Sequence, residues 1–284
     1  GFQRSIAPGE GVFDFVQSIS GDYGHLSSGD EGETIWSNYP GFTLYYANPV
    51  TGGGSLSLDF PGSGHLWLAP LIEDPYNPNQ AYLAGGGLSG GNHLFHLTAG
   101  NSSISYIEEP YSFNSTISAM GYSHLDPTHR YVLTYYGSFY HSSDDGNNWQ
   151  LSSAFDGPDA HYFYGSTIWE SQSTSGTVII GGSGYSNPPV YISYNHGASF
   201  FPLNAGLPNT LVFELAGTPD DAYFFAATEV GPYVYITEEG TWQDLAGISA
   251  PDQTYWSVEY IPELNTARFG TYGRGIWDFI IDDS

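Results

Sequence analysis

The hydrophobic and polar positions of this chain alternate in short aromatic runs, which polar turns separate. Runs such as YVLTYYGSFY (residues 131–140) and PPVYISY (188–194) have the alternating pattern of β-strands. No segment keeps a helical period for more than about three turns. The pattern therefore predicts an all-β protein.

The strand-like runs recur at a regular interval. An Asp-Pro, Pro-Asp or Pro-Glu turn precedes an aromatic strand at residues 74, 126, 219 and 262, and a weaker copy begins near residue 173. These steps of about 45 to 50 residues match the length of a four-stranded propeller blade. The repeat predicts a single β-propeller.

The number of blades and the closure of the ring are less directly specified. We expect six blades, with seven as the alternative because residues 37–73 are long and irregular. The last repeat lacks an outer strand, and we expect residues 11–19 to supply it. Pairing of the N- and C-terminal segments would then close the ring and remove exposed sheet edges.

Three polar turns share one spacing: Ser, then Asp or Asn two residues later, Gly after two more, and an apolar residue three positions beyond. They are Ser28, Asp30, Gly32 and Ile35; Ser142, Asp144, Gly146 and Trp149; and Ser193, Asn195, Gly197 and Phe200. The short Asp or Asn side chain accepts hydrogen bonds from nearby backbone N–H groups, and the Ser hydroxyl adds a partner. Glycine supplies a backbone angle that a Cβ atom would penalise.

These turns resemble the Asp-box of sialidase-like β-propellers, also called the bacterial neuraminidase repeat. The ending FGTYGRGIWDF (269–279) resembles the last blade of secreted bacterial repeat proteins and of sortilin-type propellers. The resemblance implies a propeller and places Arg274 and Trp277 at the ring closure. It describes an architecture and says little about activity.

The chain is strongly acidic, with a formal net charge of −26 and only four Lys or Arg residues. Nucleic-acid binders neutralise phosphates with Lys and Arg, so nucleic acid is not an expected partner. Anionic lipid is disfavoured for the same reason, and no apolar run approaches the roughly 20 residues that span a bilayer. The charge has two readings, which are adaptation to saline surroundings and attraction of divalent cations.

Calcium is the cation that the acidic loops favour, because it takes several oxygen ligands from loops. The candidate ligands are Asp144, Asp145, Asp220 and Asp221. The close histidine pair His93 and His96 is spaced three apart, which puts the two side chains on opposite faces of a strand. This spacing favours a structural role over a zinc site.

The resemblance raises two enzymatic readings. A sialidase clamps a carboxylate with three Arg side chains, whose bidentate geometry Lys does not reproduce. The arginines here are Arg4, Arg130, Arg268 and Arg274. Their scattered positions in the repeats argue against a triad.

A xyloglucanase-type endoglucanase, which also carries Asp-boxes, uses two carboxylates across a cleft. The resemblance places that cleft between two propellers, and this chain has room for one. Asp22, Asp59 and Glu229 are candidate carboxylates, but their sequence context does not distinguish them from solvated loop acids. We expect no catalysis, and glycoside hydrolysis if there is any.

We therefore expect a non-catalytic extracellular or cell-surface propeller that acts in protein–protein contact or self-assembly, with calcium as a candidate cofactor. The alternative is a carbohydrate-binding module or a glycoside hydrolase of the sialidase or xyloglucanase type. No Pro- or Ser-rich linker divides the 284 residues, so we expect one domain over residues 1–284. The chain begins at Gly1 without Met, and we expect it to be matured or excised from a longer precursor. Asn101 and Asn114 match the N-glycosylation pattern, and their use is left open.

Overall fold

The structure is a computed structural model, and it is built of β-strands. It describes residues 2–5, 15–19, 24–49, 53–85, 91–152, 165–185, 187–247 and 250–281. Besides strands, these ranges contain one 3₁₀ turn, η1 (Pro262–Leu264). None of their helical segments has the length and apolar character needed to cross a membrane. The prediction of an all-β protein is confirmed.

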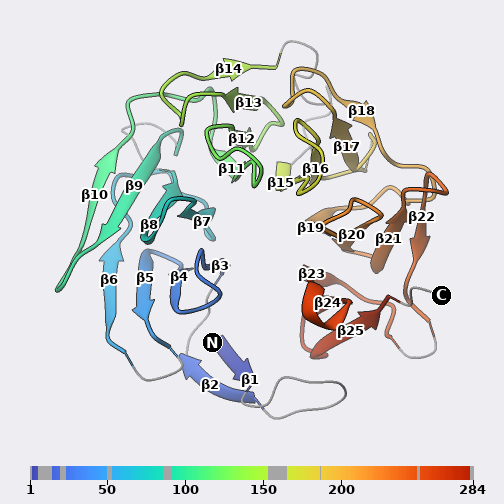
Figure 1. Cartoon of the computed structure of the whole chain (residues 1–284), viewed down its shortest axis with the longest axis horizontal. Coiled ribbons are helices and arrows are strands. Elements are labelled where there is room, and N and C mark those ends of the chain that lie inside the picture. Colours follow the sequence, from blue (N-terminus) through green and yellow to red (C-terminus); the bar gives the residue numbers. More distant parts are fainter. Residues whose placement is uncertain are drawn as a thin grey trace. The chain divides into compact units, whose positions relative to one another are not determined.

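The chain divides into two compact units, Gly1–Ile117 and Ser118–Ser284. In the first unit a two-stranded sheet is followed by two four-stranded sheets, whose hydrogen-bonded neighbours are consecutive in sequence (Figure 1). Its strands are β1 (Phe2–Ser5) and β2 (Phe15–Ile19); β3 (Leu26–Ser27), β4 (Thr34–Tyr39), β5 (Phe42–Ala47) and β6 (Ser55–Asp59); and β7 (Leu71–Asp74), β8 (Asn77–Ala84), β9 (Leu94–Ala99) and β10 (Ile104–Glu108).

The second unit holds three four-stranded sheets and one three-stranded sheet, again in sequence order. Its strands are β11 (Ile117–Tyr122), β12 (Arg130–Thr134), β13 (Phe139–Ser142) and β14 (Gln150–Leu151); β15 (Gly165–Glu170), β16 (Val178–Gly182), β17 (Val190–Ser193) and β18 (Phe201–Pro202); β19 (Val212–Gly217), β20 (Tyr223–Thr228), β21 (Pro232–Ile236) and β22 (Thr241–Asp244); and β23 (Tyr255–Ile261), β24 (Thr266–Thr271) and β25 (Ile276–Ile280). Together with the first unit, the described residues contain six consecutive sheets of three or four strands. This number agrees with six predicted blades and not with seven.

Burial differs between the strands of one sheet. Every residue of β12 and β16 is buried, whereas both residues of β14 and of β18 are exposed. A second strand packs against neighbouring sheets on both faces, so it forms a continuous apolar run instead of alternating. Between the last two four-stranded sheets, Trp169 and Phe224 pack with ring centroids 5.1 Å apart. The core of the second unit therefore lies between sheets.

The Ser142 turn follows β13 and is held by its own side chains. Ser142 Oγ donates to Asp144 Oδ1 at 2.8 Å and accepts the N–H of Gly146 at 2.9 Å. Asp144 Oδ1 also accepts the N–H of Asn148 at 2.9 Å. The carboxylate thus satisfies backbone donors that no strand partner reaches.

The other two turns repeat these bonds. They are Gly32 N–H to Ser28 Oγ at 2.8 Å, Thr34 N–H to Asp30 Oδ1 at 2.8 Å, Gly197 N–H to Ser193 Oγ at 2.8 Å and Ser199 N–H to Asn195 Oδ1 at 2.9 Å. The three glycines have φ of 83° to 85°, the left-handed region that a Cβ atom disfavours. The closing apolar residues differ, because Phe200 is only 9% exposed while Trp149 and Ile35 are partly buried.

The strand pairing expected between the chain's ends does not occur among the described strands of either unit, and it stays a prediction. Within the first unit, β2 pairs antiparallel with β1, whereas residues 11–14 lie outside the described residues. The last sheet contains only β23, β24 and β25 among the described strands. A local hairpin partner costs less chain entropy than closing a loop as long as the whole chain.

Arg274 and Trp277, predicted at the ring closure, lie in and after the turn between β24 and β25. Trp277 Nε1 donates to the carbonyl of Arg274 at 3.1 Å, and the Arg274 N–H donates to Thr271 Oγ1 at 3.1 Å. Trp277 also packs against the core of its sheet. These contacts fix a hairpin turn, and a role in closing the ring stays a prediction.

Candidate functional site

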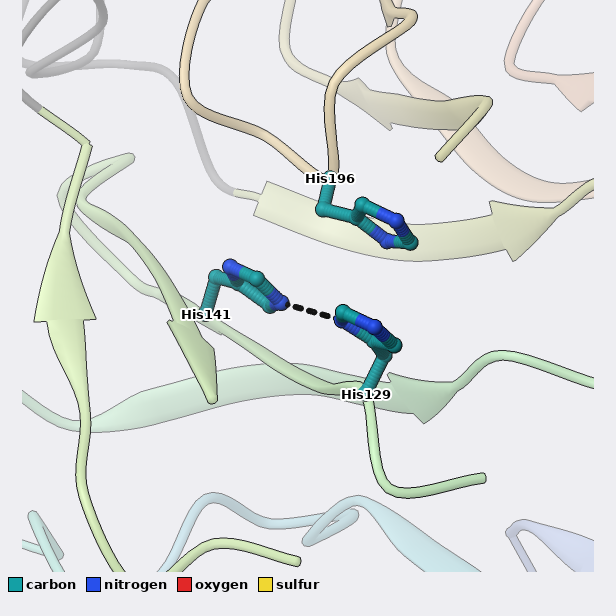
Figure 2. A group of neighbouring side chains, drawn as sticks. All are labelled: His129, His141 and His196. Atoms are coloured by element: carbon teal, nitrogen blue, oxygen red, sulfur yellow. Dashed lines mark hydrogen bonds between the residues drawn. The ribbon is translucent and has the colours of Figure 1, made fainter. Parts of the chain in front are cut away.

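Three histidines from two neighbouring sheets of the second unit come together (Figure 2). His129 directly precedes β12, His141 lies in β13, and His196 lies in the turn after β17. Each side chain offers one ring nitrogen, and these three atoms lie within 4.8 Å of one another. Among the described residues, no other group of three or more His, Asp or Glu side chains converges in this way.

The three rings form a compact, nearly parallel arrangement. His129 and His141 meet edge to edge, with Nδ1 of His129 2.8 Å from Nε2 of His141 and ring planes 7° apart (Figure 2). One N–H and one lone pair must face each other there, so a single proton lies between the two rings. His196 stacks on the face of His129, with ring centroids 3.8 Å apart.

Two further side chains approach the outer nitrogens of this cluster. The hydroxyl of Tyr131 lies 2.8 Å from Nδ1 of His196. The carboxylate of Asp126 lies 3.9 Å from Nε2 of His129 and accepts the N–H and hydroxyl of Thr128. Polar partners at the outer nitrogens orient an imidazole and select its tautomer.

Burial and mutual repulsion keep two of the rings neutral. Burial, followed by the charges of His129 and His196, lowers the pKa of His141 to about 4. Burial and His129 also lower the pKa of His196, against an opposing effect of Asp126. At neutral pH both rings are therefore uncharged. Burial raises the pKa of the Tyr131 hydroxyl, which stays protonated.

The backbone of His196 is fixed by its turn. His196 has φ 55°, as the equivalent Glu31 (57°) and Asp145 (61°) have in the other two turns. Its N–H donates to the carbonyl of Gly176 at 2.9 Å. A Cβ atom on Gly176 would lie 3.2 Å from Cδ2 of His196, so glycine makes room for the ring. The turn chemistry thus positions a cluster residue.

The residues predicted as calcium ligands are held by protein partners. Asp145 pairs with Arg130 at 3.2 Å, and Asp144 closes its turn as described above. Asp220 Oδ1 accepts the Thr218 hydroxyl at 2.6 Å, and Asp221 Oδ2 accepts two serine hydroxyls. These carboxylates join no group of three in the described residues, and a calcium role stays a prediction.

His93 and His96 contact different carboxylates. The ring of His93 is 3.8 Å from Glu108, and that of His96 is 3.5 Å from Asp74. His96 lies in β9, whereas His93 directly precedes this strand, so only one of the two histidines belongs to it. Within the described chain they form no shared ligand set.

The candidate catalytic residues show no convergence in the described residues. Glu229 accepts a hydrogen bond from the Tyr185 hydroxyl. Asp59 is the last residue of β6, and Asp22 lies outside the described residues. Arg268 forms a bidentate pair with Asp278, at 2.8 and 2.6 Å.

Solved structures of GH74 enzymes are similar to this chain. An ancestral GH74 enzyme matches with a TM-score of 0.66 and 17% identity over 88% of this chain and 35% of its own. The GH74 enzyme of Niastella koreensis gives 0.66 and 16% over 89% and 42%, and the GH74 xyloglucanase of Xanthomonas campestris gives 0.63 and 14% over 87% and 42%. The chain therefore spans less than half the length of these enzymes.

The propeller domain of Cps50 (Swd1) from Myceliophteria thermophila matches nearly end to end, with a TM-score of 0.69 and 12% identity over 96% of this chain and 88% of that chain. The fold is a β-propeller. Structural similarity at 12 to 17% sequence identity shows a shared fold and does not show a shared activity. A scan against models of protein families finds no match, and neither does a search of curated protein sequences.

Exposed aromatic side chains form a second feature of this propeller, in its second unit. Phe213 in β19 packs on Trp256 in β23 with ring centroids 4.2 Å apart, and Tyr272 lies 6.5 Å from Trp256. Trp256 is 49% exposed and Tyr272 81% exposed. Three aromatic rings in a row at a surface offer flat apolar faces to a ligand.

The sequence-based interpretation missed the histidine cluster, although one signal was present. His141 directly precedes Ser142, and His196 directly follows Asn195. Both are therefore tied to the Ser-x-Asp/Asn-x-Gly turns of consecutive repeats. Aligning the repeats would have placed them at the same end of neighbouring sheets. His129 is not adjacent to one of these Ser-x-Asp/Asn-x-Gly turns, because it follows the Asp126-Pro127 turn instead.

Proposed function

We propose that this propeller acts by binding further copies of itself or other proteins, outside the cell or at its surface, rather than by catalysis. The observation that carries the proposal is the outer edge of β25, which has no fourth strand beside it among the described residues. In the other five of the six sheets, a fourth strand covers the third. In the last sheet β25 is the third strand, and no further described strand pairs with it.

The side chains of β25 suit an interface. Trp277 and Phe279 pack against the core, while Ile276 and Ile280 are 49% and 63% exposed. β25 has five residues, as many as the outer strands β6 and β10 and more than the two-residue outer strands β14 and β18. An edge with apolar side chains is a template onto which another strand can add.

The acidic surface opposes contact between copies. A net charge of −26 repels a second copy, and salt or a bound cation reduces this repulsion. Calcium would therefore assist assembly by neutralising carboxylates near the contact. This part of the proposal predicts that chelation weakens assembly.

Light scattering of the purified chain tests the proposal, with calcium and after chelation. The wild-type chain should have a native mass above that of one copy, and Ile280→Lys should reduce it to one copy. Leu151→Lys is the matched control, because Leu151 is a 44% exposed residue of the outer strand β14 in a complete sheet. A single copy in every condition would reject self-assembly at β25.

Carbohydrate binding is the second candidate function, and the row of Phe213, Trp256 and Tyr272 favours it. Aromatic rings stack on the apolar faces of sugars, and the similar GH74 structures include a xyloglucanase. Hydrolysis is a weaker form of this candidate, since the chain spans only 35 to 42% of those GH74 chains. Release of reducing ends from xyloglucan would separate hydrolysis from binding.

A further inference from the structure

We infer that His129, His141 and His196 form a binding site for a transition-metal ion, and we assign it to Zn²⁺. The inference is independent of the proposed function, because it concerns a cluster away from β25 in sequence and needs no partner. Three imidazole nitrogens within 4.8 Å of one another are its starting point.

The outer contacts of the cluster determine which nitrogens would bind the ion. Asp126 faces Nε2 of His129 at 3.9 Å, which leaves Nδ1 pointing at His141. Tyr131 occupies Nδ1 of His196 at 2.8 Å, which leaves Nε2 as the donor atom. A metal-binding imidazole ordinarily has a polar partner on its other nitrogen. Asp126 and Tyr131 supply such partners for two of the three rings.

The three nitrogens lie within 4.8 Å of one another, near the spacing of a zinc site, but the rings must reorient to direct their lone pairs at one ion. A tetrahedral ion with Zn–N bonds of about 2.0–2.1 Å holds its ligand nitrogens roughly 3.3 Å apart. Nδ1 of His129 and Nε2 of His141 are 2.8 Å apart, so the two rings separate slightly when the ion enters. Because His196 is stacked face to face on His129, its ring must turn about the side-chain bonds for Nε2 to reach the same ion, while the turn holds its backbone. His141 then carries its proton on Nδ1 instead of Nε2, and the count of protons does not change.

The chemistry of the donors selects the metal. Three nitrogen donors suit Zn²⁺, Cu²⁺ and Ni²⁺, whereas Ca²⁺ and Mg²⁺ require oxygen ligands. The site has no thiolate, and the chain contains no Cys. All three side chains are partly exposed, so an ion can enter and keep water at a fourth position. The acidic chain also raises the local concentration of cations.

Zinc titration in competition with a chromophoric chelator tests the site, and Co²⁺ provides a visible spectrum of tetrahedral coordination. Wild type should bind about one equivalent that His141→Gln or His196→Asn removes. Tyr131→Phe should weaken binding about 10-fold, as expected for loss of an orienting hydrogen bond. His124→Gln is the control, since this exposed histidine lies outside the cluster.

The outcomes separate this site from general binding by an acidic surface. Circular dichroism of each metal-free variant verifies that it folds, and the two histidine variants lie in different sheets, so one can replace the other. Equal zinc affinity in wild type, His141→Gln and His196→Asn would overturn the inference. A Co²⁺ spectrum typical of six oxygen ligands would also overturn it. Loss of the tetrahedral spectrum in both variants, with the control unchanged, would support it.

Discussion

Glu214 and Val258 are joined across two neighbouring sheets: Glu214 Oε2 accepts the backbone N–H of Val258 at 3.0 Å. Glu214 lies in β19 and Val258 in β23, the first strands of their sheets. Burial raises the pKa of Glu214 to about 7, the Val258 N–H opposes this rise, and Glu259 adds to it. The carboxyl group therefore titrates near neutral pH in the folded chain.

The first prediction is that stability falls as the pH rises through this range. The unfolded chain loses the Glu214 proton near pH 4.5, while the folded chain keeps it to about pH 7. The protonated Glu214 therefore adds to the free energy of unfolding. This stabilisation is fully present below the pKa of Glu214 in the unfolded chain and is lost as the pH rises through its pKa in the folded chain. It amounts to at most about 3 kcal/mol, because solvent reaches part of the side chain. Urea unfolding at a series of pH values measures it.

Glu214→Gln is the control for this prediction. The amide oxygen can still accept the Val258 N–H, but the side chain no longer titrates. His141, whose folded pKa is lowered to about 4, is present in both proteins and acts with the opposite sign. The difference between wild type and variant therefore isolates Glu214. An identical dependence of unfolding on pH in the two proteins would contradict the assignment.

The second prediction compares two glycines that occupy the same position in their turns. Gly32 and Gly197 have φ of 85° and 83°. A Cβ atom on Gly32 would meet nothing within 4 Å, whereas one on Gly197 would lie 2.0 Å from Cε1 of Phe139. Gly32→Ala should cost about 1 kcal/mol through backbone strain. Gly197→Ala should cost a further ~1–3 kcal/mol, because Phe139 must move in a packed core.

Thermal or urea unfolding of the two alanine variants measures this difference. Gly146→Val adds a third turn, where we expect a loss of about 1–3 kcal/mol through strain at φ 83°. Equal losses at Gly32 and Gly197 would show that the packing against Phe139 is not as the structure has it. An unchanged Gly146→Val variant would mean that this turn is wrongly placed.

These turns show which part of the fold can be predicted from the sequence. Ser142, Asp144 and Gly146 bind one another within five residues, so a local spacing predicts the geometry. The regular interval between aromatic strands likewise predicts consecutive sheets, since neighbouring strands pair in sequence order. Local chemistry and repeat length were sufficient for the architecture.

Local spacing and repeat length do not predict the histidine cluster or the pairing of the first strands. His129 and His196 lie in different sheets, and their stacking at 3.8 Å depends on how those sheets pack. No spacing along the chain encodes that distance. The pairing of residues 15–19 with β1 was not predicted, because an apolar strand does not identify its partner along the chain.

The last prediction concerns the aromatic row. Trp256→Ala and Tyr272→Ala should each weaken retention on a soluble xyloglucan in affinity electrophoresis by about five-fold or more, the loss on truncating an aromatic anchor. Their unfolding midpoints should hardly change, because Trp256 is 49% and Tyr272 81% exposed. Trp67→Ala is the control, since Trp67 is 75% exposed and belongs to the first unit. If Trp67→Ala reduces retention as much as the other two, the aromatic residues bind without a common site. If wild type is not retained, the row is not a site for this glycan and β25 remains the better candidate for the function of the chain.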